Sequence, residues 1–446
     1  MAEGLPAPDG FDWVDDYFAH VRPHFAVREE DQLLIVLPNQ AVKLNPSGLA
    51  TLRFLKAGGA IRQLLDQIGP APEHRGDLLY FLCDFRSLMS GCLGEGRERK
   101  AVHVVAHRQP FSSLPVLSEI AVTYRCNLRC RFCYAACGCQ GPSVLATARE
   151  LPTRKVIRLL EVIHRDAKVP SVSFTGGEPI LRKDLLELVA AAKRIGLRTN
   201  LITNGTLIGA DQGGRLREAG LASAQVSLEG PIPSVHDGLT GVPGSFRRTM
   251  AGLEALRRAG VHTHTNTTIN AANADSLEAL VKLLAGLGLE RMSANMVIPS
   301  GSAADLALQI TYSQIGQIVT RVRDCARDHG IEFLWYSPTP MCLFNPLAAG
   351  LGNKSCAACD GLLSISPSGD VLPCSSYPQP VGNLCRQGFT EVWSSVRAVF
   401  FRNKQQAPTD CAGCEDFLAC AGACPLYWSA VGTGELVRVR RGHVFA

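Results

Sequence analysis

The sequence has no long apolar run and little net charge. No stretch approaches the roughly 18 apolar residues that a membrane-spanning helix needs, so we expect no membrane association. The first ten residues, M-A-E-G-L-P-A-P-D-G, contain neither the basic nor the apolar segment of a secretory signal peptide. A formal net charge of +5 over 446 residues does not indicate binding to nucleic acid. We therefore expect a cytoplasmic protein that binds neither membranes nor nucleic acids.

Cysteine, in contrast, is abundant. The chain has 17 cysteines, and in a cytoplasmic protein so many thiols favour metal ligation over disulfide bonds. The length of 446 residues and the hydrophobic content of 46% are sufficient for two or three domains with packed cores. The sequence therefore predicts a multidomain protein with metal centres.

Three cysteines form the most informative motif. Cys126, Cys130 and Cys133 lie in C-N-L-R-C-R-F-C, directly after the apolar segment Leu117–Tyr124. Thiolates at this spacing can bind three irons of a [4Fe-4S] cluster. The fourth iron is then open to a small molecule, whereas structural clusters normally have all four positions closed. The motif therefore predicts a reactive cluster.

With Phe132 before its third cysteine, the motif resembles that of the radical S-adenosylmethionine (radical SAM) superfamily. The resemblance implies that S-adenosylmethionine chelates the open iron through its amino and carboxylate groups. An electron from the cluster then cleaves the sulfonium and generates a 5′-deoxyadenosyl radical, so a reductant such as flavodoxin or ferredoxin is implied. The cofactors carry the difficult chemistry, and the protein positions and shields them.

Residues 112–338 alternate between apolar runs and helical patterns, which predicts an α/β fold with a parallel sheet. The expected strands are Leu117–Tyr124, Ser171–Phe174, Thr199–Ile202, Ala224–Leu228, His262–Thr268 and Met292–Ile298. The expected helices are 153–168, 183–195, 212–219, 245–259, 275–287 and 312–328. Six units fit the partial (β/α)6 TIM-like barrel of the superfamily. In such barrels the chemistry lies at the carboxyl ends of the strands.

The second expected strand ends in T-G-G-E-P, residues 175–179. Paired glycines allow a ligand to approach the backbone closely. By the resemblance, Gly176, Gly177 and Glu178 contact the amino group of S-adenosylmethionine. The same residues would also suit an ordinary turn between a strand and a helix.

Two further strand ends carry polar residues. Asn204 lies in T-N-G-T, and Ser227 and Glu229 lie in Q-V-S-L-E-G. The resemblance places these three residues in the cofactor pocket, with Ser227 and Glu229 near the ribose. The family often has aspartate where this chain has Glu229, and Ser227 would also suit a turn. We expect His236, in the following H-D-G-L-T-G stretch, to be structural.

Residues 1–100 form a separate pattern of a β-hairpin followed by helices. The expected elements are strands Gln32–Leu37 and Ala41–Leu44, a helix capped by Ser47 and running to about Lys56, and helical segments Ile61–Ile68 and Leu78–Met89. This winged-helix-like pattern resembles the peptide-binding (PqqD-like) domains related to the PQQ-biosynthesis chaperone. There a leader peptide adds as a strand beside the hairpin. The alternative is a small domain with a purely structural role.

Residues 339–446 are rich in cysteines at regular spacings, which resemble the SPASM domain and its auxiliary [4Fe-4S] clusters. The resemblance assigns one cluster to Cys356, Cys359, Cys374 and Cys424, and a second to Cys411, Cys414 and Cys420. We therefore expect one or two auxiliary clusters. Tetrahedral zinc is the alternative, because C-x2-C pairs also suit zinc.

The second auxiliary cluster lacks an evident fourth ligand. The SPASM pattern has a further cysteine downstream, whereas residues 425–446 contain none. The cluster would then be three-coordinate or use Cys342, Cys385, Asp370 or His443.

Five other cysteines carry no ligand assignment. We expect Cys137 and Cys139, just beyond the first motif, to be free thiols, and Cys83, Cys92 and Cys325 to be core residues.

The combination predicts a radical SAM enzyme that oxidatively modifies a leader-bearing peptide, by crosslinking, side-chain oxidation or a related maturation step. Sulfatase maturation is disfavoured, because Ser375 stands where those enzymes have an aspartate. Two alternatives stay open. One is a radical SAM enzyme that acts on a small molecule or cofactor precursor. The other is a non-catalytic zinc-binding regulator. Such a regulator would need clustered basic residues on its recognition helix, whereas the helix after Ser47 has only Arg53 and Lys56.

Overall fold

The computed structural model describes residues 10–38, 40–90, 101, 111–137, 149–304 and 306–437. The chain divides into two compact units, Met1–Val116 and Leu117–Ala446. In the described part of the chain, no helix combines the length and the apolar character needed to cross a membrane.

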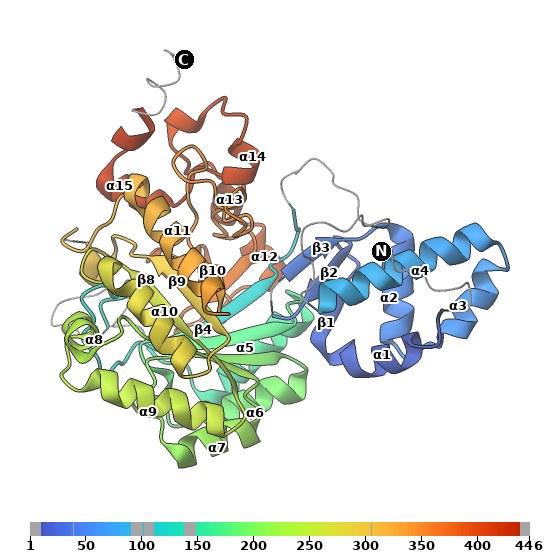
Figure 1. The fold of residues 1–446 in the computed structure, drawn as a ribbon, viewed down its shortest axis with the longest axis horizontal. Helices are drawn as coiled ribbons and strands as arrows, with labels where there is room; N and C mark the ends of the chain where they lie inside the picture. The colour runs from blue at the N-terminus through green and yellow to red at the C-terminus, as the bar shows by residue number, and fades with distance from the viewer. Residues whose placement is uncertain are drawn as a thin grey trace. The chain divides into compact units, whose positions relative to one another are not determined.

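The N-terminal unit is a small antiparallel sheet with helices around it (Figure 1). Its elements are α1 (Val14–Val21), η1 (Arg22–His24), β1 (Phe25–Arg28), β2 (Leu33–Val36), β3 (Gln40–Lys43), α2 (Pro46–Lys56), α3 (Ile61–Ile68) and α4 (Pro72–Met89). The strand order is β1-β2-β3, so the expected hairpin of β2 and β3 is part of a three-stranded sheet.

The start of α2 differs from the sequence-based expectation. The cap is Asn45 rather than Ser47, and the Asn45 side chain accepts a hydrogen bond from the Gly48 backbone N–H at 2.8 Å. Pro46 occupies the first helical turn, where its fixed φ and missing N–H carry no penalty. The helix therefore begins two residues earlier than a cap at Ser47 would allow.

The second unit is built on one long sheet. Its strands are β4 (Leu117–Thr123), β5 (Ser171–Gly176), β6 (Arg198–Thr203), β7 (Ser223–Ser227), β8 (His262–Ile269), β9 (Arg291–Met296), β10 (Glu332–Trp335), β11 (Leu362–Ile365), β12 (Asp370–Leu372) and β13 (Gly382–Asn383). Neighbours from β4 to β10 pair in parallel, which confirms the predicted α/β class with a parallel sheet.

Helices connect these strands (Figure 1). They are α5 (Thr153–Arg165), α6 (Leu185–Ile195), α7 (Ala210–Ala219), α8 (Pro233–Thr240), α9 (Ser245–Arg258), α10 (Leu277–Gly286) and α11 (Tyr312–Asp328). Neighbouring helices pack against one another, as α5 does with α6, α6 with α7, α7 with α9, and α10 with α11. Short helices complete the C-terminal segment: α12 (Phe389–Trp393), α13 (Val396–Arg402), α14 (Phe417–Cys420) and α15 (Pro425–Val431).

The sheet extends beyond the six expected strands at both ends. Its order is β10-β9-β8-β7-β6-β5-β4-β11-β12-β13, in which β11 pairs in parallel with β4, and β12 and β13 follow antiparallel. Among the strands that the structure describes, no pairing joins the two ends into a closed barrel. The cysteine-rich segment is thus attached to the strand that precedes the C-x3-C-x2-C motif.

Candidate active site

The loop with Cys126, Cys130 and Cys133 follows β4 directly, at the carboxyl end of the strand. The backbone N–H of Leu128 donates to Cys126 Sγ at 3.5 Å, and that of Cys137 donates to Cys133 Sγ at 3.3 Å. Such N–H···S bonds stabilise charged sulfur and are among the features that tune iron–sulfur clusters. The donor set and its hydrogen bonds therefore fit a [4Fe-4S] cluster.

The α8–α9 segment holds this loop in place. The backbone N–H groups of Arg129 and Arg131 donate to the carbonyl oxygens of Thr240 and Leu239, each at 2.9 Å. The segment is itself fixed by Asp237, whose carboxylate accepts from the backbone N–H groups of residues 244 and 246 and from the hydroxyl of residue 245. The H-D-G-L-T-G stretch thus fixes the backbone of the cysteine loop through these hydrogen bonds.

The paired glycines at the end of β5 allow the strand to lie directly against the cysteine loop. Gly176 has a φ of 135°, and a Cβ there would lie 2.0 Å from the Thr123 carbonyl oxygen. A Cβ on Gly177 would lie 2.3 Å from the Arg125 carbonyl oxygen. The backbone N–H of Gly177 donates to the Thr123 carbonyl oxygen at 2.8 Å. Both glycines are therefore required for packing, whichever ligand they contact.

Replacing Gly177 with alanine should destabilise the protein. The new Cβ would meet the backbone rather than a flexible side chain, so we expect a loss of at least about 1–3 kcal/mol, as for overpacked cores. Urea unfolding followed by circular dichroism measures this loss. Gly214→Ala on α7 is the matched control, because a Cβ there meets no atom within 4 Å. Equal stability of the two variants would contradict the predicted clash.

Glu178 lies at the centre of a buried hydrogen-bond network. Its carboxylate is fully buried and accepts from the backbone N–H of Ile180 at 3.0 Å, the Thr203 hydroxyl at 2.9 Å and the backbone N–H of Asn204 at 2.8 Å. Burial raises the pKa of Glu178 to about 7, against the lowering effect of these donors. The carboxylate thus ties the end of β5 to the end of β6. Its expected contact with an ammonium group stays a prediction.

Asn204 connects the end of β6 to the cysteine loop. Its Nδ2 donates to Asn127 Oδ1 at 3.0 Å and lies 4.0 Å from Cys126 Sγ, while its Oδ1 accepts from the Thr206 backbone N–H at 2.9 Å. Asn127 in turn donates to the Thr206 hydroxyl at 2.8 Å. The sequence interpretation missed Asn127 and Thr206, although both lie inside motifs that it named.

Glu229 also has an internal partner. It is 1% exposed, and its carboxylate accepts from the backbone N–H of Thr268 at 2.9 Å. Burial raises the pKa of Glu229 to about 8. The Glu229 backbone N–H donates to Nδ1 of His236 at 3.1 Å, so the His236 proton lies on Nε2. Ser227 ends β7 and is partly buried. The ribose contacts of Ser227 and Glu229 are untested predictions.

Glu119 is a site residue that the sequence interpretation missed. It lies on β4 on the same face as Ala121, which packs with Cys126 and Cys133. Its carboxylate accepts from the Ser364 hydroxyl at 2.7 Å and from the hydroxyl and backbone N–H of Ser375, while burial raises its pKa. The signal was the only charged residue in a strand that the sequence predicts to be largely buried. Glu119 thus reaches the segment next to Cys374.

The first auxiliary set of cysteines is brought together in the C-terminal segment. The thiol of Cys356 is near enough to those of Cys359, Cys374 and Cys424 to raise the pKa of each, in addition to the larger effect of burial. For Cys359 and Cys424 the result is a pKa of about 12. A bound metal ion deprotonates such thiols outright. The four residues therefore fit one cluster.

Two basic side chains, one at the end of α13 and one just after it, hold the backbone of Cys356 and Cys359. Lys404 is 2% exposed, and its Nζ donates to the Cys356 carbonyl oxygen at 2.6 Å and to the Asp360 carboxylate at 2.7 Å. Arg402 donates to the Cys359 carbonyl oxygen at 3.1 Å. These cations were not anticipated, because they lie more than forty residues after the cysteines they hold.

In the second set, the Cys414 backbone N–H donates to the Cys411 carbonyl oxygen at 3.2 Å. Among the side chains that the structure describes, no three His, Cys, Asp or Glu converge on a position for one metal ion. A [4Fe-4S] cluster does not require such convergence, because each thiolate binds a different iron.

The remaining cysteines have varied surroundings. Cys137 is buried, and its thiol hydrogen-bonds with the sulfur of Cys133. Cys83 packs against the core of the N-terminal unit, and Cys325 is partly buried on α11. Cys92, Cys139 and the candidate ligand His443 lie outside the described residues.

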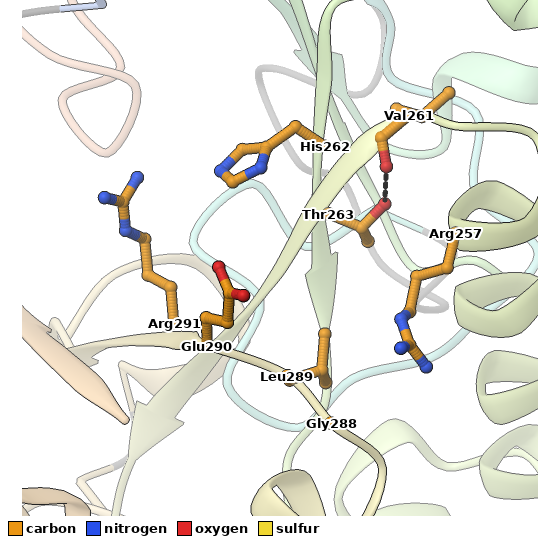
Figure 2. A pocket seen from close by; sticks show the side chains of 8 residues that line it. All are labelled: Arg257, Val261, His262, Thr263, Gly288, Leu289, Glu290 and Arg291. Carbon is orange, nitrogen blue, oxygen red and sulfur yellow. Dashed lines mark hydrogen bonds between the residues drawn. The ribbon is translucent and has the colours of Figure 1, made fainter. Parts of the chain in front are cut away.

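A surface pocket lies at the amino ends of the strands, whereas the cysteine loop lies at their carboxyl ends. It is formed where β8 and β9 begin. Figure 2 shows His262 and Arg291 on one side of β8 and Arg257 on the other. Because the cysteine loop, Glu178 and Asn204 all follow strand ends, this pocket is separate from the candidate active site.

Comparison with known proteins decides the family. The radical SAM superfamily model matches residues 120–284, and that of SPASM, an iron–sulfur cluster-binding domain, matches residues 352–415. The chain is 30% identical over 317 residues to AdoMet-dependent heme synthase of Oleidesulfovibrio alaskensis, covering 68% of this chain and 80% of the relative. The chain belongs to the radical SAM superfamily. Its [4Fe-4S] and S-adenosylmethionine cofactors and its SPASM module accordingly match the expectation.

The chain is also similar to a protein named as a peptide cyclase, and in fold to one solved with a peptide. The chain is 31% identical over 315 residues to PqqA peptide cyclase of Xanthomonas axonopodis pv. citri, covering 68% of this chain and 80% of the relative. Streptococcus suis SuiB, solved with its precursor peptide SuiA, has a similar fold with a TM-score of 0.65 and 16% identity, covering 91% of this chain and 95% of SuiB. The structure of anSMEcpe with bound AdoMet also has a similar fold, with a TM-score of 0.55 and 16% identity, covering 74% of this chain and 98% of anSMEcpe.

Proposed function

We propose that this radical SAM enzyme oxidatively modifies a peptide that carries a leader sequence. The observation that carries the proposal is the outer edge of β3 in the N-terminal unit, with which no described strand pairs. A peptide can add to such an edge as a further strand. The proposal is supported by the identity with PqqA peptide cyclase. The fold likeness to SuiB also supports it, because coverage of 91% of the chain must extend into the N-terminal unit.

The register of the sheet identifies which backbone groups of β3 face away from β2. The Leu44 N–H donates to the Gln32 carbonyl oxygen at 2.8 Å, and Lys43 pairs with Leu33. Hydrogen bonding alternates along an antiparallel strand, so the N–H groups of Ala41 and Lys43 point outward. No described strand pairs with this edge. On the other outer strand, β1, the Phe25 carbonyl oxygen already accepts a hydrogen bond from the Lys56 ammonium group.

We assign the parts of the chain as follows. Residues 1–100 recognise the leader, residues 112–338 form the radical SAM core, and residues 339–446 carry the auxiliary clusters. Cys126, Cys130 and Cys133 would hold the reactive cluster, and the strand-end residues from Gly176 to Glu229 would hold and orient S-adenosylmethionine. When bound, these cofactors supply the 5′-deoxyadenosyl radical. The protein orients the substrate and excludes water.

The proposal is tested with anaerobically purified, reduced enzyme, S-adenosylmethionine and leader-bearing peptides encoded by small reading frames beside its gene. We expect a peptide product that has lost hydrogen, formed together with 5′-deoxyadenosine, and no product when the leader is removed. Mass spectrometry measures both. Turnover of a peptide without regard to its leader would contradict leader recognition.

A cofactor precursor is the second candidate substrate, because the heme synthase relatives match the chain at 28–30% identity. The same assay with heme precursors distinguishes the two candidate functions. Conversion of a heme precursor, without modification of any peptide, would favour this second function. Membership of the radical SAM superfamily argues against the alternative of a non-catalytic zinc regulator.

The auxiliary clusters should survive loss of the reactive cluster. In a variant with Cys126, Cys130 and Cys133 replaced by alanine, we expect the protein to keep iron and labile sulfide, because the cysteines of residues 356–424 are unchanged. Iron and sulfide analysis after anaerobic reconstitution provides the measurement. Zinc without labile sulfide in that variant would contradict the assignment of auxiliary iron–sulfur clusters.

A further inference from the structure

The second auxiliary cluster has three cysteines in sequence, Cys411, Cys414 and Cys420, and no cysteine follows Cys424. Within these 446 residues, a fourth cysteine ligand would therefore come from before Cys411. The structure brings a distant segment to this position, the turn after β10.

The turn spans residues 340–344 and is held at both ends. The backbone N–H groups of Leu343 and Phe344 donate to the Pro340 carbonyl oxygen at 2.9 and 3.0 Å. The Phe344 ring packs on Gly316 of α11, where a Cβ would lie 2.8 Å from the ring. At the other end, the buried backbone N–H of Met341 donates to Cys420 Sγ at 3.5 Å. The turn is thus anchored to a sulfur of the second set.

Cys342 directly follows the residue that makes this N–H···S bond. Its side chain is exposed, as is that of Cys414, whereas Cys420 is buried. Through its neighbour Met341, Cys342 is therefore held next to Cys420, although 79 residues separate Met341 from Cys420 in sequence.

Two of the competing candidates, Asp370 and Cys385, have other neighbours. Asp370 accepts from the Ser368 hydroxyl at 2.6 Å and from Asn383 Nδ2 at 2.7 Å. Cys385 lies beside Gly369, where a Cβ would be 2.7 Å from its sulfur. Asp416 precedes α14, the helix that contains Cys420, and is therefore a further candidate ligand.

We propose that Cys342 is the fourth ligand of the second auxiliary cluster, which it completes with Cys411, Cys414 and Cys420. The assignment rests on the proposed presence of that cluster. Thiolate is the ligand that iron–sulfur clusters use most, and four thiolates close all four iron positions. The second auxiliary cluster is then a closed, electron-transferring centre rather than a site for substrate.

The test uses the variant without Cys126, Cys130 and Cys133, so that only auxiliary clusters contribute to the signal. Adding Cys342→Ala should remove about one cluster's worth of iron and sulfide, or convert one cluster to a [3Fe-4S] form visible by electron paramagnetic resonance. Cys385→Ala, at another exposed cysteine, is the matched control and should change neither. Asp416→Asn and His443→Ala test the remaining ligands.

An unchanged iron content and spectrum in Cys342→Ala would overturn the assignment, as would the same loss in Asp416→Asn or His443→Ala instead. Zinc without sulfide in the parent variant would contradict the proposed clusters themselves, which is a distinguishable result.

Alkylation of the unmutated holoprotein gives a second measurement. With iodoacetamide and mass spectrometry, Cys342 should be protected until a chelator removes the iron, whereas Cys385 should react before and after. Labelling of Cys342 in the intact holoprotein would equally overturn the assignment.

Discussion

Replacing Cys126, Cys130 and Cys133 with alanine should abolish the formation of 5′-deoxyadenosine. The three thiols lie on one loop at the end of β4, and backbone N–H groups point at two of their sulfurs. Without these ligands the reactive cluster is not held, and no electron can reach S-adenosylmethionine at the strand ends. We expect product at the level of a reaction without enzyme, together with the loss of about one cluster's worth of iron.

The matched control removes three other thiols, Cys83, Cys325 and Cys385, each to alanine. Cys83 packs in the N-terminal unit, Cys325 lies on α11, and Cys385 is exposed. This control should keep its iron and its formation of 5′-deoxyadenosine. High-performance liquid chromatography of the quenched reactions measures the product. Cleavage that persists in the first variant would show that the C-x3-C-x2-C motif is not the reactive centre.

The parallel sheet could be predicted well because its strands are short apolar runs separated by amphipathic helices. Each of the six expected strands matches one of β4–β9 to within about two residues, which is the usual error at element boundaries. Strand β10 and strands β11–β13 were missed. They are only two to four residues long, and their pairing depends on contacts distant in sequence, such as that of β11 with β4.

The candidate site was predictable only where its residues are contiguous. C-N-L-R-C-R-F-C and T-G-G-E-P carry their chemistry within a few residues, so their spacing identifies them. The environment of Glu119 depends on Ser364 and Ser375, more than 240 residues away, which no local pattern shows. The position of Cys342 beside Cys420 likewise requires the turn after β10 to meet the C-terminal segment.

The internal partners of Glu178 and Glu229 could not be predicted either. Both motifs suggested carboxylates directed at a ligand. In the structure, the carboxylate of Glu178 and that of Glu229 each accept a backbone N–H from the end of a neighbouring strand. A buried carboxylate without such donors would cost several kcal/mol. Hydrogen bonding within the protein therefore determines how these side chains are held before any ligand binds.

Substrate capture provides the last prediction. Ala41→Pro removes an outward N–H of β3 and leaves the Val42 and Leu44 N–H groups that face β2. Proline is tolerated on edge strands for this reason. We expect peptide-independent formation of 5′-deoxyadenosine to be unchanged. Modification of the leader-bearing peptide below saturation should fall by about tenfold or more, because an unpaired peptide carbonyl costs about 1–3 kcal/mol.

Ala41→Val is the matched control, because valine adds the same number of side-chain carbons as proline but keeps the N–H. It should bind and modify the peptide like the original enzyme. Fluorescence anisotropy of a labelled leader measures binding separately from catalysis, and circular dichroism confirms that both variants fold. Equal leader affinity in the two variants would show that the peptide does not pair with the edge of β3. Modification that is lost in both would instead indicate that the side chain of residue 41, which packs towards Leu33 and Ile35, matters rather than its N–H.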